Sequence, residues 1–97
     1  RQMLAKEGMV VAVIEVDQND LSKIMNIDLI SRGFVFAKDA GDLLNNGAME
    51  IKRAISTRQG KIDSDRVVKS VAVDTLERFF FQKTARRPMI LPVVVEV

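Results

Sequence analysis

The side chains that could do chemistry in this chain are carboxylates, hydroxyls and cations, because it contains no histidine and no cysteine. The missing histidines exclude an imidazole general base and an imidazole zinc ligand, and the missing cysteines exclude a thiolate metal site. Close carboxylate pairs occur at Asp17/Asp20, Asp39/Asp42 and Asp63/Asp65. Each pair lies at an expected turn or helix start, where aspartate commonly caps backbone amides. The pairs therefore favour local capping over acid–base chemistry or metal binding.

Basic side chains offer a second kind of chemistry, contact with RNA phosphate, and the candidates are Arg32, Lys61, Arg86 and Arg87. Residues 32–38 have the basic-Gly-aromatic-x-aromatic spacing of the base-stacking strand in RNA-recognition motifs. However, Val35 replaces the consensus small residue, Asp39 replaces the final aromatic, and no second aromatic strand is present. We therefore expect Phe34 and Phe36 to pack in a core beneath the helices.

The hydrophobic pattern predicts two strands in the first part of the chain. Residues 9–16 alternate with apolar side chains on both faces, and residues 17–20 read as a turn. Residues 21–27 fit a loop or an irregular hairpin arm. The second strand is predicted at residues 28–38, with a bulge or close backbone approach at Gly33. The short link favours antiparallel pairing of the two strands.

Two helices should follow. The first begins at a cap on Asp39 and ends near Gly60, and the second begins at Asp63 or Ser64 and ends near Lys83. Apolar residues recur at helical spacing in both: Leu43, Leu44, Ala48, Ile51 and Ile55, then Val68, Val71, Ala72, Leu76, Phe79 and Phe80.

A final strand is predicted from Met89, after Pro88 ends the second helix. Pro92 cannot donate a ladder hydrogen bond, so this strand should lie at a sheet edge or carry a bulge. The predicted fold class is α+β: a small three-stranded mixed sheet with two antiparallel helices packed on one face, in the order β-β-α-α-β. Residues 1–7 are expected to end a linker, and residues 8–97 to form a single domain.

The loop between the helices and the end of the second helix leave alternatives open. The element order resembles part of a KH module, which clamps RNA with a Gly-x-x-Gly loop. Gly60 is the one glycine of residues 59–62, so KH-like binding is disfavoured, although Arg58 and Lys61 could still touch phosphate. Arg86 and Arg87 could bind phosphate or carboxylate bidentately, or could serve as helix-end cations that keep an edge strand soluble.

More apolar side chains are present than two helices on one sheet face can cover. If Val10, Phe34 and Leu91 point toward the helices, alternation places five others on the opposite face: Val11, Val13, Val35, Ile90 and Val94. An exposed apolar patch of this kind marks an interaction site. We therefore predict an interface there, with the rest of a longer chain or with a second subunit.

Two blocks of sequence resemble the C-terminal end of the ribonuclease J family. They are Arg-Arg-Pro-Met-Ile-Leu-Pro at residues 86–92 and Asp-Leu-Ile-Ser-Arg-Gly-Phe-Val-Phe at residues 28–36, separated by the helical insert. The resemblance covers about residues 8–97. It implies a parent chain that is a zinc-dependent, β-CASP-type ribonuclease with 5′-to-3′ exonuclease and endonuclease activity in mRNA decay and rRNA maturation. The histidine-rich metal motifs of that family are not in this sequence, so zinc is expected in the parent chain and no cofactor in this part.

Composition limits the remaining choices. The 97 residues suit one domain, 47% are hydrophobic, and the net charge is +2. No apolar run reaches the ~20 residues of a membrane-spanning helix. We expect a cytoplasmic, non-catalytic assembly domain that supports homo- or hetero-oligomers of ribonuclease J subunits and meets RNA through the parent. The alternative is an RNA-binding module that grips substrate for a nuclease.

Overall fold

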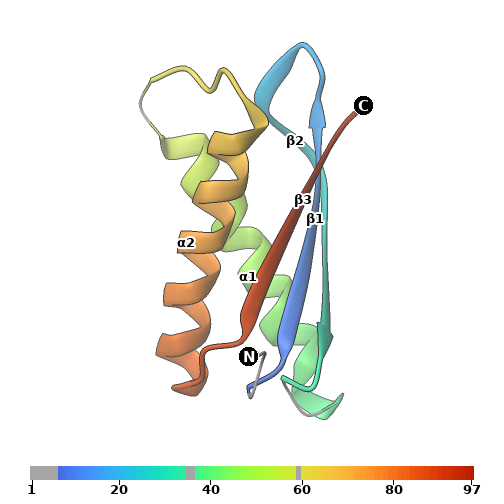
Figure 1. Ribbon diagram of the computed structural model, residues 1–97, viewed down its shortest axis with the longest axis vertical. Helices are drawn as coiled ribbons and strands as arrows, with labels where there is room; N and C mark the ends of the chain where they lie inside the picture. Colours follow the sequence, from blue (N-terminus) through green and yellow to red (C-terminus); the bar gives the residue numbers. More distant parts are fainter. Residues whose placement is uncertain (1–6, 35–36, 59) are drawn as a thin grey trace, which may run out of the picture.

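The computed structural model describes residues 7–34, 37–58 and 60–97, with the backbone alone for residues 37–40. A three-stranded sheet carries two antiparallel helices on one face (Figure 1). The elements are β1 (Met9–Asp17), β2 (Asp20–Arg32), α1 (Ala37–Thr57), α2 (Asp65–Thr84) and β3 (Met89–Glu96). The predicted α+β class and the β-β-α-α-β order are confirmed.

The strands lie in the order β2-β1-β3, so β1 is central and β3 is an edge strand, as its proline predicted. β1 pairs antiparallel with β2 and parallel with β3, which makes the sheet mixed. The amides of Met89 and Val97 donate to Gly8 and Val16 at 2.9 and 2.8 Å. In a parallel pair, alternate residues bond to the same neighbour. Odd-numbered residues of β3 therefore bond to β1, and Pro92 lies where its missing N–H would face the free edge.

β2 begins earlier and ends earlier than predicted. It includes residues 21–27, which the sequence suggested as a loop or hairpin arm, and it stops at Arg32 rather than at residue 38. Gly33 ends it with a φ of +70°, outside the strand region. Phe34, the next residue, is buried as predicted, with its ring edge-on to Phe80 at a centroid distance of 4.8 Å. Phe36 lies outside the described residues.

The helices cover the face of the sheet to which the even-numbered residues of β1 point. Those residues are fully buried: Val10, Ala12, Ile14 and Val16. Ile51 and Ile55 of α1 meet them, together with the predicted stripe of α2, in which Val71 is partly buried. Gly47 allows α1 close to its neighbours, since an added Cβ would lie 3.2 Å from both Leu29 and Leu76.

The helix ends differ slightly from the prediction. α1 begins at Ala37, two residues before the expected cap at Asp39, and ends at Thr57. Ser64 precedes α2 in extended conformation, as expected of an N-cap, but its side chain makes no cap hydrogen bond. α2 ends at Ala85, whose φ is +60° and whose amide donates to the Phe81 carbonyl at 2.8 Å. In the part of the chain that is described, neither helix offers the long apolar stretch that crossing a bilayer would need.

Candidate functional site

The side of the sheet away from the helices is lined with apolar side chains. Val11 of β1 pairs with Ile30 on one side and Leu91 on the other, and Val13 pairs with Val93. Neighbours in register point to the same side of a sheet. The helix-free face therefore carries the apolar side chains of Met9, Val11, Val13, Ile30, Met89, Leu91, Val93 and Val95, and Glu15 of β1 lies on the same face between Asn26 and Val95. Asp28, Asn26 and Arg32 lie on its β2 margin.

The β3 side chains of this face are much more exposed than a core allows. Leu91 is 40% exposed and Val93 is 42% exposed, and Ile30 on β2 reaches 44%. Met89 and Val95 are exposed to a similar degree. Single exposed apolar residues are ordinary, but a contiguous group over three strands is typical of an interaction surface.

The sequence prediction placed the wrong side chains of β3 on this face. Val11 and Val13 do lie on it, whereas Ile90 and Val94 point toward the helices; Ile90 is 8% exposed, and Val94 packs against the core. Leu91 was expected to face the helices, but it lies on the helix-free face. Because β3 is apolar on both sides, the alternation of its side chains does not show which residues face the helices. The hydrogen bond from Met89 to Gly8 determines which residues of β3 face which side of the sheet. Val35 lies outside the described residues.

The four predicted RNA contacts do not form one cluster. Arg32, Arg86 and Arg87 lie at the end of the sheet where β1 and β3 begin, since Met9 pairs with both Arg32 and Met89. Lys61 lies in the loop between α1 and α2, at the opposite end of the helices (Figure 1). α2 has 20 residues, so about 30 Å of helix separates the two ends.

Arg86 and Arg87 are held by contacts within the fold. A guanidinium nitrogen of Arg86 donates to the Phe34 carbonyl at 2.5 Å, which ties the α2–β3 junction to the chain leaving β2. The Arg87 amide donates to the Glu7 carboxylate, and the Arg87 guanidinium lies 4.2 Å from the Phe81 ring centroid. These contacts favour the helix-end interpretation of the two arginines over a free phosphate grip.

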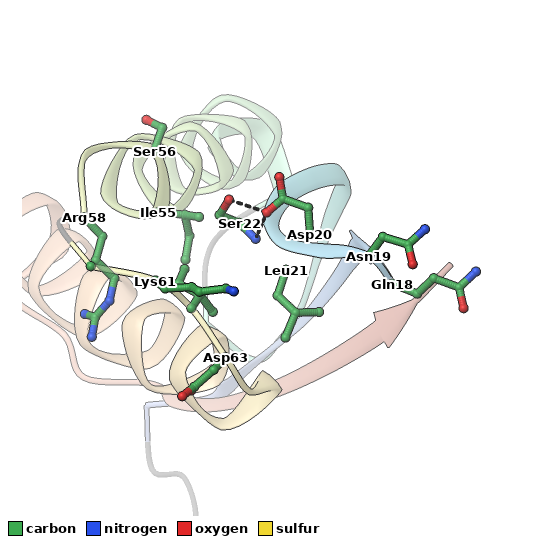
Figure 2. Close-up of a pocket in the computed structure, with 12 residues that line it drawn as sticks. Gln18, Asn19, Asp20, Leu21, Ser22, Ile55, Ser56, Arg58, Lys61 and Asp63 are labelled. Carbon is green, nitrogen blue, oxygen red and sulfur yellow. Dashed lines mark hydrogen bonds between the residues drawn. The ribbon is translucent and has the colours of Figure 1, made fainter.

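Lys61 borders a hollow of about 800 Å³ between the β1–β2 turn and the α1–α2 loop (Figure 2). Its polar lining includes Asn19, Asp20, Ser22 and Ser56. Both the amide and the hydroxyl of Ser22 donate to Asp20 Oδ1, at 3.1 and 2.6 Å. These bonds, with smaller effects of Lys23 and Lys61, hold the pKa of Asp20 below its ordinary value. Asp20 therefore stays ionised at neutral pH.

Two carboxylates of the β1–β2 turn accept hydrogen bonds from backbone amides. Asp17 Oδ1 accepts from the Asn19 amide at 2.7 Å, and Asp20 is engaged by Ser22. Within the described residues, no group of three or more His, Cys, Asp or Glu could hold a metal ion. The donor set of these residues does not fit the zinc that the family resemblance implies for the parent chain.

Comparison with known proteins identifies the family. The chain matches the profile of the ribonuclease J C-terminal domain over residues 1–97. It is 30% identical over 99 residues to ribonuclease J2 of Bacillus subtilis and 33% identical over 96 residues to ribonuclease J 1 of Streptococcus pyogenes. A ribonuclease J 2 of Staphylococcus aureus is 27% identical over 99 residues. These alignments cover 98–100% of this chain but 17–18% of the relatives. The chain therefore belongs to the ribonuclease J C-terminal domain family.

Proposed function

We propose that this domain is a non-catalytic assembly element of a ribonuclease J-like enzyme, and that its helix-free face packs against the same face of a second copy. The observation that carries this proposal is the contiguous group of exposed apolar side chains on that face, with Leu91 and Val93 each about two-fifths exposed. Two such sheets can pack face to face about 10 Å apart, as in β-sandwiches.

A second copy fits because the face is complementary to itself. A two-fold contact brings one patch onto the same patch of the partner, so an apolar centre with polar margins serves both copies at once. Burying the remaining exposed area of Ile30, Leu91, Val93 and Val95 would contribute on the order of 1 kcal/mol per side chain. The free edge of β3 is a poorer site for strand pairing, since Pro92 removes one of its outward donors.

The parent enzyme supplies the chemistry in this proposal. Its activity would be zinc-dependent cleavage of RNA, as exonuclease and endonuclease, in mRNA decay and rRNA maturation in the cytoplasm. The relatives' printed names support the ribonuclease part of this statement. The absence of histidine and cysteine from the 97 residues supports a site elsewhere in the parent chain.

Sedimentation velocity on the 97-residue chain tests the assembly role. We expect a monomer–dimer equilibrium across a concentration series, shifted to monomer by Val93→Lys because the lysine would be desolvated at the dimer centre. Met49→Lys is the matched control: Met49 is 60% exposed but lies on α1, away from the helix-free face. It should leave the equilibrium unchanged.

Circular dichroism spectra of both variants establish that each remains folded. A wild-type chain that stays monomeric at millimolar concentration would contradict self-association through this face. The same holds if Val93→Lys dimerises as strongly as the wild type. Either result would favour the other predicted partner of this face, which is the rest of the parent chain.

A further inference from the structure

The charged side chains of the helix-free face are separated by sign along the strands. Strand pairing divides this face into four rows, each with one residue from β2, β1 and β3, from Arg32–Met9–Met89 in the first row to Asn26–Glu15–Val95 in the fourth. Arg32 is the one charge of the first row, whereas Asp28 lies in the third row and Glu15 in the fourth. Neighbouring rows are two residues apart, so the first and fourth rows are separated by about 20 Å.

The charges just beyond the rows have the same polarity. Next to the first row, the two arginines of residues 86–87 lie beside one acid, Glu7. Beyond the fourth row, residues 17–23 contain two aspartates and one lysine. The helices cover the other side of the sheet (Figure 1), so their charges are farther from a partner on this face. The face is therefore positive where β1 begins and negative where β1 ends.

The three charged residues of the face have no oppositely charged partner in the part of the chain that the structure describes. The one ion pair found among the described residues lies on α1. Asp28 accepts a hydrogen bond from Asn26 Nδ2 at 3.1 Å, and Arg32 donates to the carbonyl of the residue before it. Arg32 therefore keeps guanidinium donors, and Asp28 keeps carboxylate acceptors, for a partner on this face.

Two aligned sheets that pack face to face can be related by a two-fold axis in two ways. If the strands of the two copies run in the same direction, each row lies over the same row of the partner, and the two Glu15 carboxylates meet on the central strands. Bringing two carboxylates together away from water is costly. If the strands run in opposite directions, the first row lies over the fourth row of the partner. Arg32 then lies over Asn26 of the partner and close to its Asp28 and Glu15.

We propose that the two copies pack with their strands in opposite directions, and that Arg32 of each copy binds Asp28 and Glu15 of the other. This inference rests on the proposed self-association and specifies how the two copies are arranged. Arginine suits this place because its planar guanidinium carries five donors and pairs bidentately with carboxylates. The charge pairs at the margin fix the register of the two sheets, while the apolar side chains between them supply the affinity.

Sedimentation velocity with charge-swapped variants of the 97-residue chain tests this arrangement. Arg32→Glu sets a carboxylate against the partner's Asp28, and Asp28→Arg sets a guanidinium against the partner's Arg32. Each variant alone should therefore dimerise about tenfold or more weakly than the wild type at low salt. An equimolar mixture of the two should recover the wild-type affinity to within about threefold, because each exchanged charge then meets its opposite.

Lys69→Glu is the matched control. It makes the same change of charge as Arg32→Glu on an exposed residue of α2, behind the sheet, and should leave dimerisation unchanged. Circular dichroism spectra establish that each variant remains folded.

A second measurement uses Met9→Cys and a short bis-maleimide, which reports on one position because the chain has no cysteine of its own. Opposite strand directions place the two copies of residue 9 about 20 Å apart, so no cross-linked dimer is expected. Same directions would place them over each other.

Three results would overturn the arrangement alone, with the wild-type chain still dimeric: undiminished dimerisation of both charge-swapped variants, no recovery in their mixture, or efficient cross-linking of Met9→Cys. A wild-type chain that stays monomeric would instead contradict the proposed function, and the arrangement would fail with it. The two failures are therefore distinguished by the wild type.

Discussion

At the scale of single residues, Gly8 has less room for a side chain than the other glycines of the described chain. Its φ is +88°, and an added Cβ would lie 2.4 Å from the Gly33 carbonyl oxygen and 2.6 Å from the Phe34 nitrogen. Both are backbone atoms, so no side chain can move aside. Gly8→Ala should therefore lower the free energy of unfolding by about 3 kcal/mol or more, from backbone strain and steric overlap together. Urea denaturation followed by circular dichroism measures this change.

Gly60 provides the matched control for this prediction. Its φ is +92°, but an added Cβ would meet nothing within 4 Å. Gly60→Ala should cost about 1 kcal/mol, the strain of a left-handed backbone without the overlap. Equal costs at the two glycines would show that the approach of Gly8 to Gly33 is not what limits the position.

The contact between Gly8 and Gly33 shows which part of a residue's role the sequence predicts. A close backbone approach at Gly33 was predicted from the sequence, but its partner was not, because Gly8 is more than 20 residues away and the strand pairing brings the two together. Arg86 is similar. The sequence shows that Arg86 is a cation at a helix end. Its hydrogen bond to the Phe34 carbonyl, 52 residues away, could be identified only from the folded structure.

At the scale of elements, the two faces of β3 give the sharpest test. Val94 packs against the core, and its neighbour Val93 lies on the helix-free face. Val94→Lys should lower the free energy of unfolding by about 2 kcal/mol or more, because it directs a charge toward the core. Val93→Lys should change it by less than about 0.5 kcal/mol for the monomer. Urea denaturation at low protein concentration compares the two, and the reverse order would invalidate the register of β3 on β1.

The sequence predicted β1, α2 and the start of β3 closely, and it failed on β2 for a physical reason. The partly buried apolar residues of β2 are spaced by three and then by two: Leu21, Ile24, Ile27 and Leu29. Register shifts near Glu15, Val16 and Asp17 interrupt the pairing there. A bulge changes which side a residue faces, so the simple alternation that reveals a strand is lost. The sequence could not show which residues of β3 face the helices, because both sides of this strand are apolar.

At the scale of the whole molecule, the fold separates basic residues that the sequence analysis grouped as candidates for one kind of contact. Lys61 and Arg86 were both candidates for RNA contact, yet they lie at opposite ends of the helices. Arg58 and Arg66, in contrast, are eight positions apart in sequence and line one hollow because α1 and α2 are antiparallel. Grouping cations by type alone cannot anticipate such placements, since they depend on the loop geometry and on helix packing.

The central position of β1 makes the whole fold depend on the last residues of the chain. β3 supplies Ile90 and Val94 to the core and forms one of the two ladders of β1. Loss of a buried side chain such as Ile90 costs about 2–5 kcal/mol, and loss of the partly buried Val94 adds to it, against a total stability of about 5–15 kcal/mol for a domain of this size. The two-stranded sheet that would remain is marginal in water. A chain ending at Pro88 should therefore lack cooperative thermal unfolding, measured by circular dichroism.

A chain ending at Glu96 is the control, because it keeps the whole of β3 and loses only the half-exposed Val97 with its two backbone hydrogen bonds, from its amide to Val16 and from the Gln18 amide to its carbonyl. It should unfold cooperatively. A synthetic peptide of residues 89–97, added to the chain ending at Pro88, should restore dispersed amide resonances in a two-dimensional NMR spectrum, since it supplies the missing ladder and the missing core side chains. Cooperative unfolding of the shortened chain without the peptide would show that β1, β2 and the two helices form a stable core by themselves. β3 would then be an accessory strand, and the parallel pairing between the two ends of the chain would contribute little to the stability of the domain.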